Sequence, residues 1–277
     1  MKPTAWLALL AAATFSACAQ PSPEQQIVDD AAAALGGRDR IVAVKTLVIE
    51  GEGMNGNLGQ DVTPEATSQA FNLTGYRRAI DVPAGRQRIE QTRTPNFPYF
   101  QGQQPQKQVL GVDGNVGYNV AANGTAARVA DAAANDRRAD IYHHPLTMVR
   151  AALDPAAKAS NPRTEGAQSL VDITVPGGQT LTLAIDGSTK LPARVVSRTS
   201  NTNLGDVVIE TSFADYQDVN GLQLPARLTT KTDDYTTVTI AGGGAAIGAA
   251  EAAAAGAARS PVSPSTVCVA TRISTVV

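Results

Sequence analysis

Apolar and polar side chains alternate along most of the chain, with the two-residue period of a β-strand. The alternation begins near Thr46 and recurs in residues 86–94, 107–112 and 168–175. Turn-forming sequences separate such segments at intervals of roughly ten residues, as expected for strands joined by tight turns. These turn sequences are Asp113-Gly114, Gly177-Gly178, Asp186-Gly187, residues 201–203, Asn220-Gly221 and Asp233-Asp234. The pattern predicts an antiparallel meander.

Two segments depart from this period and have helical spacing instead. The first covers residues 27–45 and is broken at Gly36-Gly37, and the second covers residues 136–153 and ends at Asp154-Pro155. A long sheet must bury one face against other elements, and these helices are the elements available. We therefore predict a mainly β fold of the α+β type: a strongly curved antiparallel sheet or unclosed β-barrel with helices on its concave side.

The N-terminus has the features of a secretory signal. A single basic residue, Lys2, precedes an apolar run from Ala5 to Phe15, and small residues follow the run before Cys18. The run is shorter than the about 20 residues that a helix needs to span a bilayer. We predict a signal peptide over residues 1–17 and export of the remaining chain.

Phe15-Ser16-Ala17-Cys18 resembles the lipobox of bacterial lipoproteins, in which the cysteine is acylated and becomes the first residue of the mature chain. The resemblance implies a membrane anchor at Cys18. Because Ala19 follows rather than Asp, it also implies the outer membrane, on its periplasmic side. The alternative is an ordinary secretory signal and a soluble periplasmic protein. Cys268 is the only other cysteine, so an acylated Cys18 leaves no intramolecular disulfide.

Composition marks a boundary at each end of the predicted β domain, residues 27–240. Residues 18–26 are polar and rich in Pro and Gln, and we predict that they form a tether. Residues 241–277 are rich in Ala and Gly, carry few charges and continue no period. We predict that this low-complexity tail is disordered or only locally helical.

Overall composition limits the classes of function. The chain has 277 residues, of which 43% are apolar and 17% charged, which is enough to build a core. The formal net charge is −2, the pI is near 5.7 and the basic residues are dispersed, which argues against a nucleic-acid partner. His143 and His144 are the only histidines, which argues against a His-rich metal centre. We expect no metal or other cofactor.

The adjacent pair His143-His144 has a structural explanation. Neighbouring residues of a helix point about 100° apart, and Pro145 indicates a helix boundary. The pair therefore does not suit a single metal ion, and we predict that one histidine is packed and the other exposed.

Four aspartates could pair for acid–base work, namely Asp215, Asp218, Asp233 and Asp234. Three of them fall at predicted turns, where Asp is favoured because its side chain bonds to nearby backbone. Gly242 to Gly244 lacks the spacing and context of a phosphate-binding loop, and no serine lies in a Gly-x-Ser-x-Gly elbow. The sequence therefore predicts no catalytic, cofactor-binding or metal-binding residue.

Several blocks between residues 27 and 240 resemble, in order, the N-terminal region of exported bacterial metallo-β-lactamase-fold hydrolases. The blocks are Ala34–Gly37, Val44–Leu47, Asn57–Gln60, Gln91–Pro95, Tyr142–Leu146, Asp186–Pro192 and Gly205–Lys231. In that family a zinc-binding catalytic domain with a His-x-His-x-Asp-His run follows the β region. This chain has no such run. The resemblance thus implies an accessory region without its enzyme, and we do not expect this chain to be an enzyme.

The segment Gly221–Pro225, which ends in Leu-Pro after a glycine turn, is also similar to lipoprotein carriers and sorting factors of the LolA/LolB-like superfamily. That resemblance implies an unclosed barrel with helices as a lid. Two functional hypotheses follow: a non-catalytic, lipid-anchored cell-envelope domain, or a periplasmic carrier of an acyl chain, a lipoprotein or another apolar ligand. A carrier needs an apolar cavity of some hundreds of Å³, whereas an accessory domain does not.

Overall fold

The computed structural model describes residues 21–58, 69–98, 102–201 and 204–248. Within these ranges the strands form one antiparallel sheet of thirteen strands, in the order β6-β5-β4-β3-β2-β1-β13-β12-β11-β10-β9-β8-β7. The strands are β1 (Thr46–Gly56), β2 (Ala70–Asp81), β3 (Arg86–Pro95), β4 (Gln106–Asp113), β5 (Val116–Val120), β6 (Ala126–Arg128), β7 (Lys158–Glu165), β8 (Gln168–Thr174), β9 (Thr180–Asp186), β10 (Pro192–Asn201), β11 (Gly205–Val219), β12 (Leu222–Thr232) and β13 (Tyr235–Gly248).

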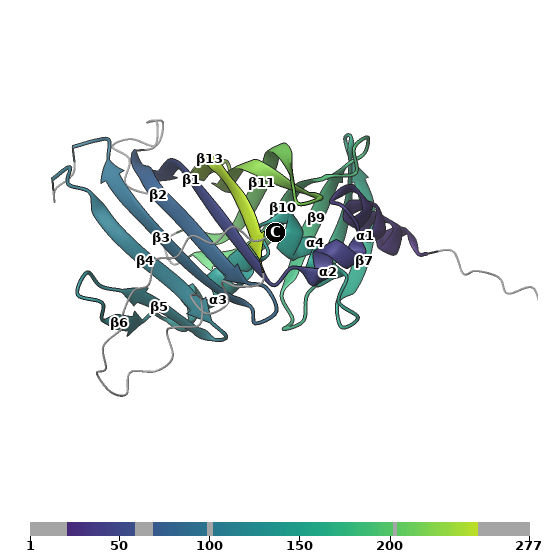
Figure 1. Ribbon diagram of the computed structural model, residues 1–277, viewed down its shortest axis with the longest axis horizontal. Coiled ribbons are helices and arrows are strands. Elements are labelled where there is room, and N and C mark those ends of the chain that lie inside the picture. The colour runs from purple at the N-terminus through teal and green to yellow at the C-terminus, as the bar shows by residue number, and fades with distance from the viewer. Residues whose placement is uncertain (1–20, 59–68, 99–101, 202–203, 249–277) are drawn as a thin grey trace, which may run out of the picture.

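The sheet is strongly curved and open, as the sequence predicts (Figure 1). Its edges are β6 and β7, and its centre is the pairing of the first strand with the last, β1 with β13. Between the two edges the chain forms helices α3 (Asp131–Ile141) and α4 (Pro145–Ala152). The connection from one edge to the other therefore carries these two helices across the inner face of the sheet.

Apolar residues from all layers meet on the inner face. Helices α1 (Pro23–Ala34) and α2 (Arg38–Ala43) and helix α4 contribute Val28, Ile41 and Val149 to the same buried cluster that contains Leu47 and Leu183 from the strands. Contacts of α1 with β7 and β8, and of α4 with β10 and β12, place these helices over the second half of the sheet. The core thus lies between the helices and the concave face, as predicted.

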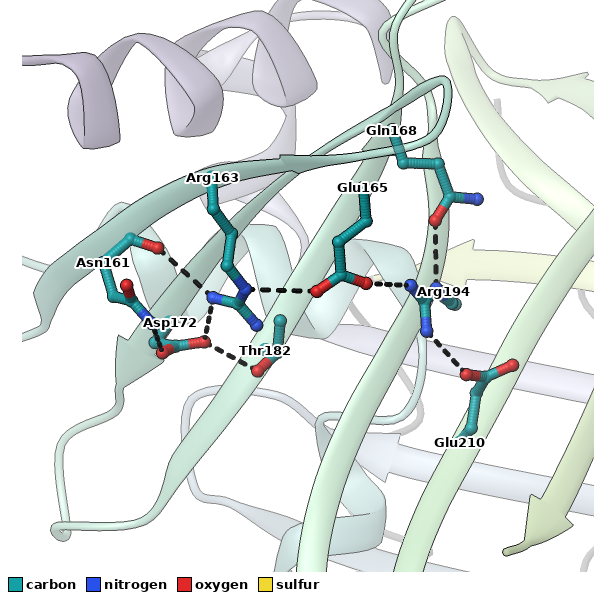
Figure 2. Close-up of polar contacts among 8 residues, drawn as sticks. All are labelled: Asn161, Arg163, Glu165, Gln168, Asp172, Thr182, Arg194 and Glu210. Atoms are coloured by element: carbon teal, nitrogen blue, oxygen red, sulfur yellow. Dashed lines mark hydrogen bonds and ion pairs between the residues drawn. The ribbon is translucent and has the colours of Figure 1, made fainter. Parts of the chain in front are cut away.

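The outer face of strands β7 to β11 is polar. Arg194 donates to Glu210 at 2.8 Å and to Glu165 at 3.1 Å, and Arg163 donates to Asp172 at 3.0 Å (Figure 2). These side chains alternate along their strands with buried residues such as Val171 and Val195, so the network faces solvent while its neighbours face the core. Exposed ion pairs of this kind contribute little stability, and they keep the face soluble.

The helical segments differ in detail from the predicted ones. Helix α1 begins at Pro23 and is capped by the Ser22 hydroxyl, so residues 23–26 of the predicted tether are helical. The predicted segment 27–45 is two helices, separated where Gly36 and Gly37 adopt positive φ angles of 117° and 103°.

The second helical segment is also two helices, and it begins earlier than predicted. Helix α3 starts at Asp131, five residues before the predicted segment, and the turn at 142–144 separates it from α4. His144 caps α4 and Pro145 occupies its first position, where proline needs no hydrogen-bond partner.

The predicted start of the low-complexity tail at residue 241 is wrong, because β13 continues to Gly248. Residues 245–248 pair with Ile49 to Thr46 of β1, and Ile247 packs against the core. Alanine and glycine carry little periodic signal, yet their backbone groups complete the ladder. The remaining tail, the predicted signal peptide and Cys18 lie outside the described residues. Among the helices that the structure describes, none is both long and apolar enough to cross a membrane.

The extent of β13 predicts where the chain can be shortened. A chain ending at Ile240 loses the partners of Thr46 to Glu52, including the partly buried Ile247, so we expect a loss of at least about 2 kcal/mol. Since 1 kcal/mol moves the melting temperature of a protein this size by roughly 2 to 4 °C, thermal unfolding should shift down by more than about 4 °C. A chain ending at Gly248 is the control and should melt within about 2 °C of the full chain. Equal melting temperatures for the two shortened chains would contradict the assignment.

Candidate functional site

A hollow of about 220 Å³ remains on the concave face where the helices do not fill it. Half of its lining residues are apolar or aromatic and come from both halves of the sheet, and among the polar ones Arg78 and Thr211 contact Asp140 and His143 at the end of α3 and in the turn that follows. Its lining consists of Asn55, Leu73, Tyr76, Arg78, Ile89, Gln91, Leu110, Asp140, His143, Thr211, Leu228, Thr230, Val238 and Ile240. A second hollow of about 190 Å³ adjoins α3 and shares Ile89, Leu110 and Asp140 with the first.

Strand register explains why residues far apart in sequence line one hollow. Thr211 of β11 lies opposite Thr230 of β12, which in turn lies opposite Val238 of β13. On the other side, Arg78 of β2 lies opposite Ile89 of β3, which lies opposite Leu110 of β4. Directly opposed residues of an antiparallel pair share a face of the sheet, so each row faces inward together.

Arg78 carries the positive charge of the hollow and is only 5% exposed. Its Nε donates to Gln87 Oε1 at 2.9 Å, and its Nη2 donates to the Asp140 carbonyl at 2.5 Å and pairs with Asp140 Oδ2 at 3.1 Å. Gln87 in turn donates to Asp140 Oδ2 and to the Arg137 carbonyl, both at 3.0 Å. These contacts neutralise the guanidinium and hold the C-terminal end of α3 on β2 and β3, where a cation also suits the helix dipole.

His143 lies between two hydroxyls on the floor of the hollow. Its Nδ1 is 3.0 Å from Thr211 Oγ1 and its Nε2 is 2.8 Å from Ser197 Oγ. Thr211 Oγ1 is also 2.9 Å from Thr230 Oγ1. Burial lowers the pKa of His143 to about 4, so the ring is neutral at neutral pH.

His144 is fully buried and has a structural contact. Its Nδ1 accepts a hydrogen bond from the Leu146 amide at 3.2 Å, which caps α4. Its Nε2 is buried and has no hydrogen-bond partner among the residues that the structure describes. Burial, with a smaller contribution from nearby Arg78, lowers the pKa of His144 to about 3.

The prediction that one histidine would be exposed is therefore wrong. Both rings are buried because the turn that carries them is sandwiched between the sheet and its own helices, a position that the local sequence does not reveal. Nowhere in the described ranges do three or more His, Cys, Asp or Glu side chains lie where they could hold one metal ion.

The aspartates singled out from the sequence lie in turns and on the outer surface. Asp218 accepts from the Gly221 amide at 3.1 Å, and Asp233 accepts from the Val208 amide at 2.9 Å. Asp215 pairs with Arg227 at 2.7 Å on exposed side chains. Asp234 is exposed in the turn after β12. None of the four lines the hollow described above.

Apart from His143, the sequence did not identify the polar residues that line the hollow. One signal was available: Arg78 occupies a position between Tyr76 and Ile80, all three at the inward-facing spacing of β2, where an apolar side chain is expected. Thr211 lies in the same way between Ile209 and Phe213 on β11, whereas Ser197 has an apolar same-face neighbour, Val195, on one side only. A polar side chain at an inward position is therefore the sequence mark of this site.

No protein-family model matches the chain, and no curated protein matches it either. A search of solved structures finds similarity to a LolA superfamily protein from Nitrosomonas europaea, with a TM-score of 0.42, 9% identity and coverage of 82% of this chain and 94% of that one. A DUF1329 family protein from Desulfovibrio piger has a TM-score of 0.44 and 11% identity, and the match covers 86% of this chain and 99% of that one. LprF from Mycobacterium bovis has a TM-score of 0.27 and 13% identity, and the match covers 82% of this chain and 93% of that one.

At these identities and scores the likenesses carry no functional conclusion. None of the comparisons shows a relationship to metallo-β-lactamase-fold hydrolases, so that resemblance stays a hypothesis.

The two buried histidines predict a loss of stability in mild acid. Their folded pKa values of about 4 and 3 lie below the ordinary 6.5, so below pH 6.5 the unfolded chain takes up protons that the folded chain excludes. The free energy of unfolding should fall as the pH drops from 6.5 to 5, with a slope of up to about 1.4 kcal/mol per pH unit for each histidine.

Chemical denaturation across this pH window measures the slope. In the double variant His143→Gln, His144→Asn both side chains stay polar, and Asn keeps an acceptor for the α4 cap. We expect a clearly flatter profile for this variant between pH 6.5 and 5. Identical slopes in the parent and the variant would show that the histidines are not the titrating groups.

Proposed function

We propose that this protein is a non-catalytic cell-envelope protein that binds an apolar or amphipathic molecule in the hollow of its curved sheet. The observation that carries the proposal is the unfilled space on the concave face, where Leu73, Leu228 and Ile240 form an apolar wall beside the polar end at His143. Ligand sites are typically concave, mostly apolar and provided with a few fixed polar groups.

The size of the hollow limits the ligand. Volumes of about 220 and 190 Å³ lie below the roughly 300 to 1,000 Å³ typical of drug-sized ligand sites. Since the two hollows share Ile89 and Leu110, a slender chain can extend from one toward the other. A single alkyl chain therefore fits the space better than a triacylated lipoprotein terminus.

The accessory-region hypothesis requires no ligand, whereas the binding hypothesis does. Ligand binding therefore distinguishes the two hypotheses. If the hollow is merely incomplete packing, then apolar molecules of any kind should fail to bind. The same experiment therefore decides between a binding protein and an envelope domain without a ligand.

A bulky side chain placed in the hollow tests the binding function. Leu110→Trp should fill the space beside Ile89 and reduce binding of the neutral fluorescent probe N-phenyl-1-naphthylamine at least about tenfold, which corresponds to about 1.4 kcal/mol. Val109→Trp is the matched control, because the preceding residue of the strand points to the opposite face. Fluorescence titration measures both. Equal probe binding by the two variants, or no binding by the parent chain, would contradict the proposal.

We also propose that Cys18 anchors the protein by acylation to the outer membrane, on the periplasmic side. The lipobox-like sequence before Cys18 supports this, and so does the short distance in sequence to Ser22, where the folded domain begins with the cap of α1. A few residues reach at most about 3.6 Å each, so an anchored domain would stay close to the membrane surface.

The variant Cys18→Ser tests the anchor. It should move the protein from the membrane fraction to the soluble periplasmic fraction and abolish incorporation of labelled palmitate. Cys268→Ser is the control and should leave both unchanged. Unaltered fractionation of Cys18→Ser would show that the signal is an ordinary secretory one.

A further inference from the structure

We propose that the hollow selects amphipathic ligands whose polar end is uncharged, such as an alcohol, an amide or an ester, over the corresponding carboxylates and amines. This inference rests on the proposed binding function and names the chemical class of the ligand. Two independent observations support it: the balance of charge in the hollow, and the hydroxyl relay that ends at its wall.

The charges of the hollow already satisfy each other. Arg78 and Asp140 are the only Lys, Arg, Asp or Glu side chains among the described residues that line it, and they pair at 3.1 Å. The guanidinium also donates through Nε to Gln87 and through Nη2 to the Asp140 carbonyl. A bound carboxylate or ammonium would bring one uncompensated charge into a confined site, where desolvation of an unpaired ion is costly.

His143 does not supply a compensating charge. It is buried, it lies between Thr211 and Ser197, and its ring nitrogens are both engaged by hydroxyls. A neutral imidazole has one donor and one acceptor, and each hydroxyl has one donor and can accept. The histidine therefore acts as the middle of a neutral chain of hydrogen bonds that runs from Ser197 to Thr230.

The chain can run in either direction. If His143 Nδ1–H donates to Thr211, then Thr211 donates to Thr230, and the Thr230 hydroxyl keeps its proton for a ligand acceptor. If Nδ1 is the unprotonated nitrogen, Thr211 donates to it, Thr230 donates to Thr211, and Thr230 Oγ1 is left to accept from a ligand donor.

The consequence is a polar end that adapts to the ligand without a change of charge. Thr230 lines the hollow beside Leu228 and Val238, so its hydroxyl lies where the head of an alkyl chain would meet the wall. A hydroxyl, an amide or an ester oxygen can each be paired by one of the two arrangements. A fixed acceptor could pair an alcohol or an amide but not an ester, which has no donor, and a fixed donor would leave the N–H or O–H of an amide or alcohol without a partner.

A series of ligands with the same chain and different heads tests the selection. Binding of 1-decanol, decanamide, methyl decanoate, decanoate and decylamine is measured by displacement of N-phenyl-1-naphthylamine at pH 7.5, below the critical micelle concentration of each ligand. We expect the three uncharged ligands to bind at least about tenfold more tightly than decanoate and decylamine. Decanoate or decylamine binding as tightly as decanol would overturn the inference but leave the binding function standing. If neither the probe nor any of the ligands binds, both fail.

The relay is tested by removing one hydroxyl. Thr230→Val keeps the shape of the side chain and should weaken decanol and decanamide about fivefold, the scale of one net hydrogen bond, with the affinity of the apolar probe unchanged. Thr230→Ser should restore the affinity. Thr229→Val, on the opposite face of the same strand, should change nothing. If Thr230→Val binds decanol and decanamide as the parent does, the relay does not contact the head and the inference is wrong.

Discussion

The buried guanidinium of Arg78 is the contact on which the arrangement of the hollow depends. A cation that is almost wholly removed from water is tolerated only if other groups replace its hydration, and Asp140, Gln87 and a helix carbonyl do so. These partners come from both the sheet and α3, so satisfying the charge also fixes where α3 lies. The position of α3 sets the space left above Ile89 and Leu110, and the paired charge makes that space electrically neutral.

Topology places the helices where this contact can form. The first and last strands of the sheet, β1 and β13, pair in its middle, which leaves β6 and β7 as distant edges. The chain must travel between these edges, and the route across the concave face buries the apolar sides of α4 and the turn before it. The same route brings His143 onto β10 and β11, where its ring forms hydrogen bonds with Ser197 and Thr211. The same path of the chain between β6 and β7 therefore builds both the core and the polar end of the hollow.

Charged side chains are arranged differently on the two faces of the sheet. On the outer face Arg163 and Arg194 share carboxylates in an open network that water also solvates (Figure 2). On the inner face a buried Arg78 pairs with a half-exposed Asp140, and the other polar groups that line the hollow are hydroxyls, amides and a neutral imidazole. Solvent screens a mismatched charge on the outer face more effectively than one beside the buried guanidinium. This contrast is why the inner face, with few charges, is the surface suited to an apolar ligand.

The sequence by itself determined the class of the fold. The two-residue period, the turn pairs, the break at Gly36-Gly37 and the boundary at Pro145 are local signals. Local backbone preferences are enough to indicate strands, turns and these two helix breaks, although α1 and α3 begin earlier than predicted. A curved antiparallel sheet with helices on its inner side followed from them. The sequence also marked the histidine pair as structural, although it placed one of the rings in solvent.

Only the tertiary structure decided which strands meet and which polar groups are buried together. The pairing of β1 with β13 joins residues that are about as far apart as the domain allows, and residues 241–248 show no periodic pattern because their side chains are mostly Ala and Gly. The backbones of β1 and β13 can approach closely because glycine has no side chain: a Cβ on Gly53 would stand 1.7 Å from the Thr239 carbonyl oxygen. Likewise Arg78, Asp140, His143 and Thr211 lie on four separate elements or turns. Their neutral cluster arises from the register of the strands and the path of α3, which no single stretch of sequence records.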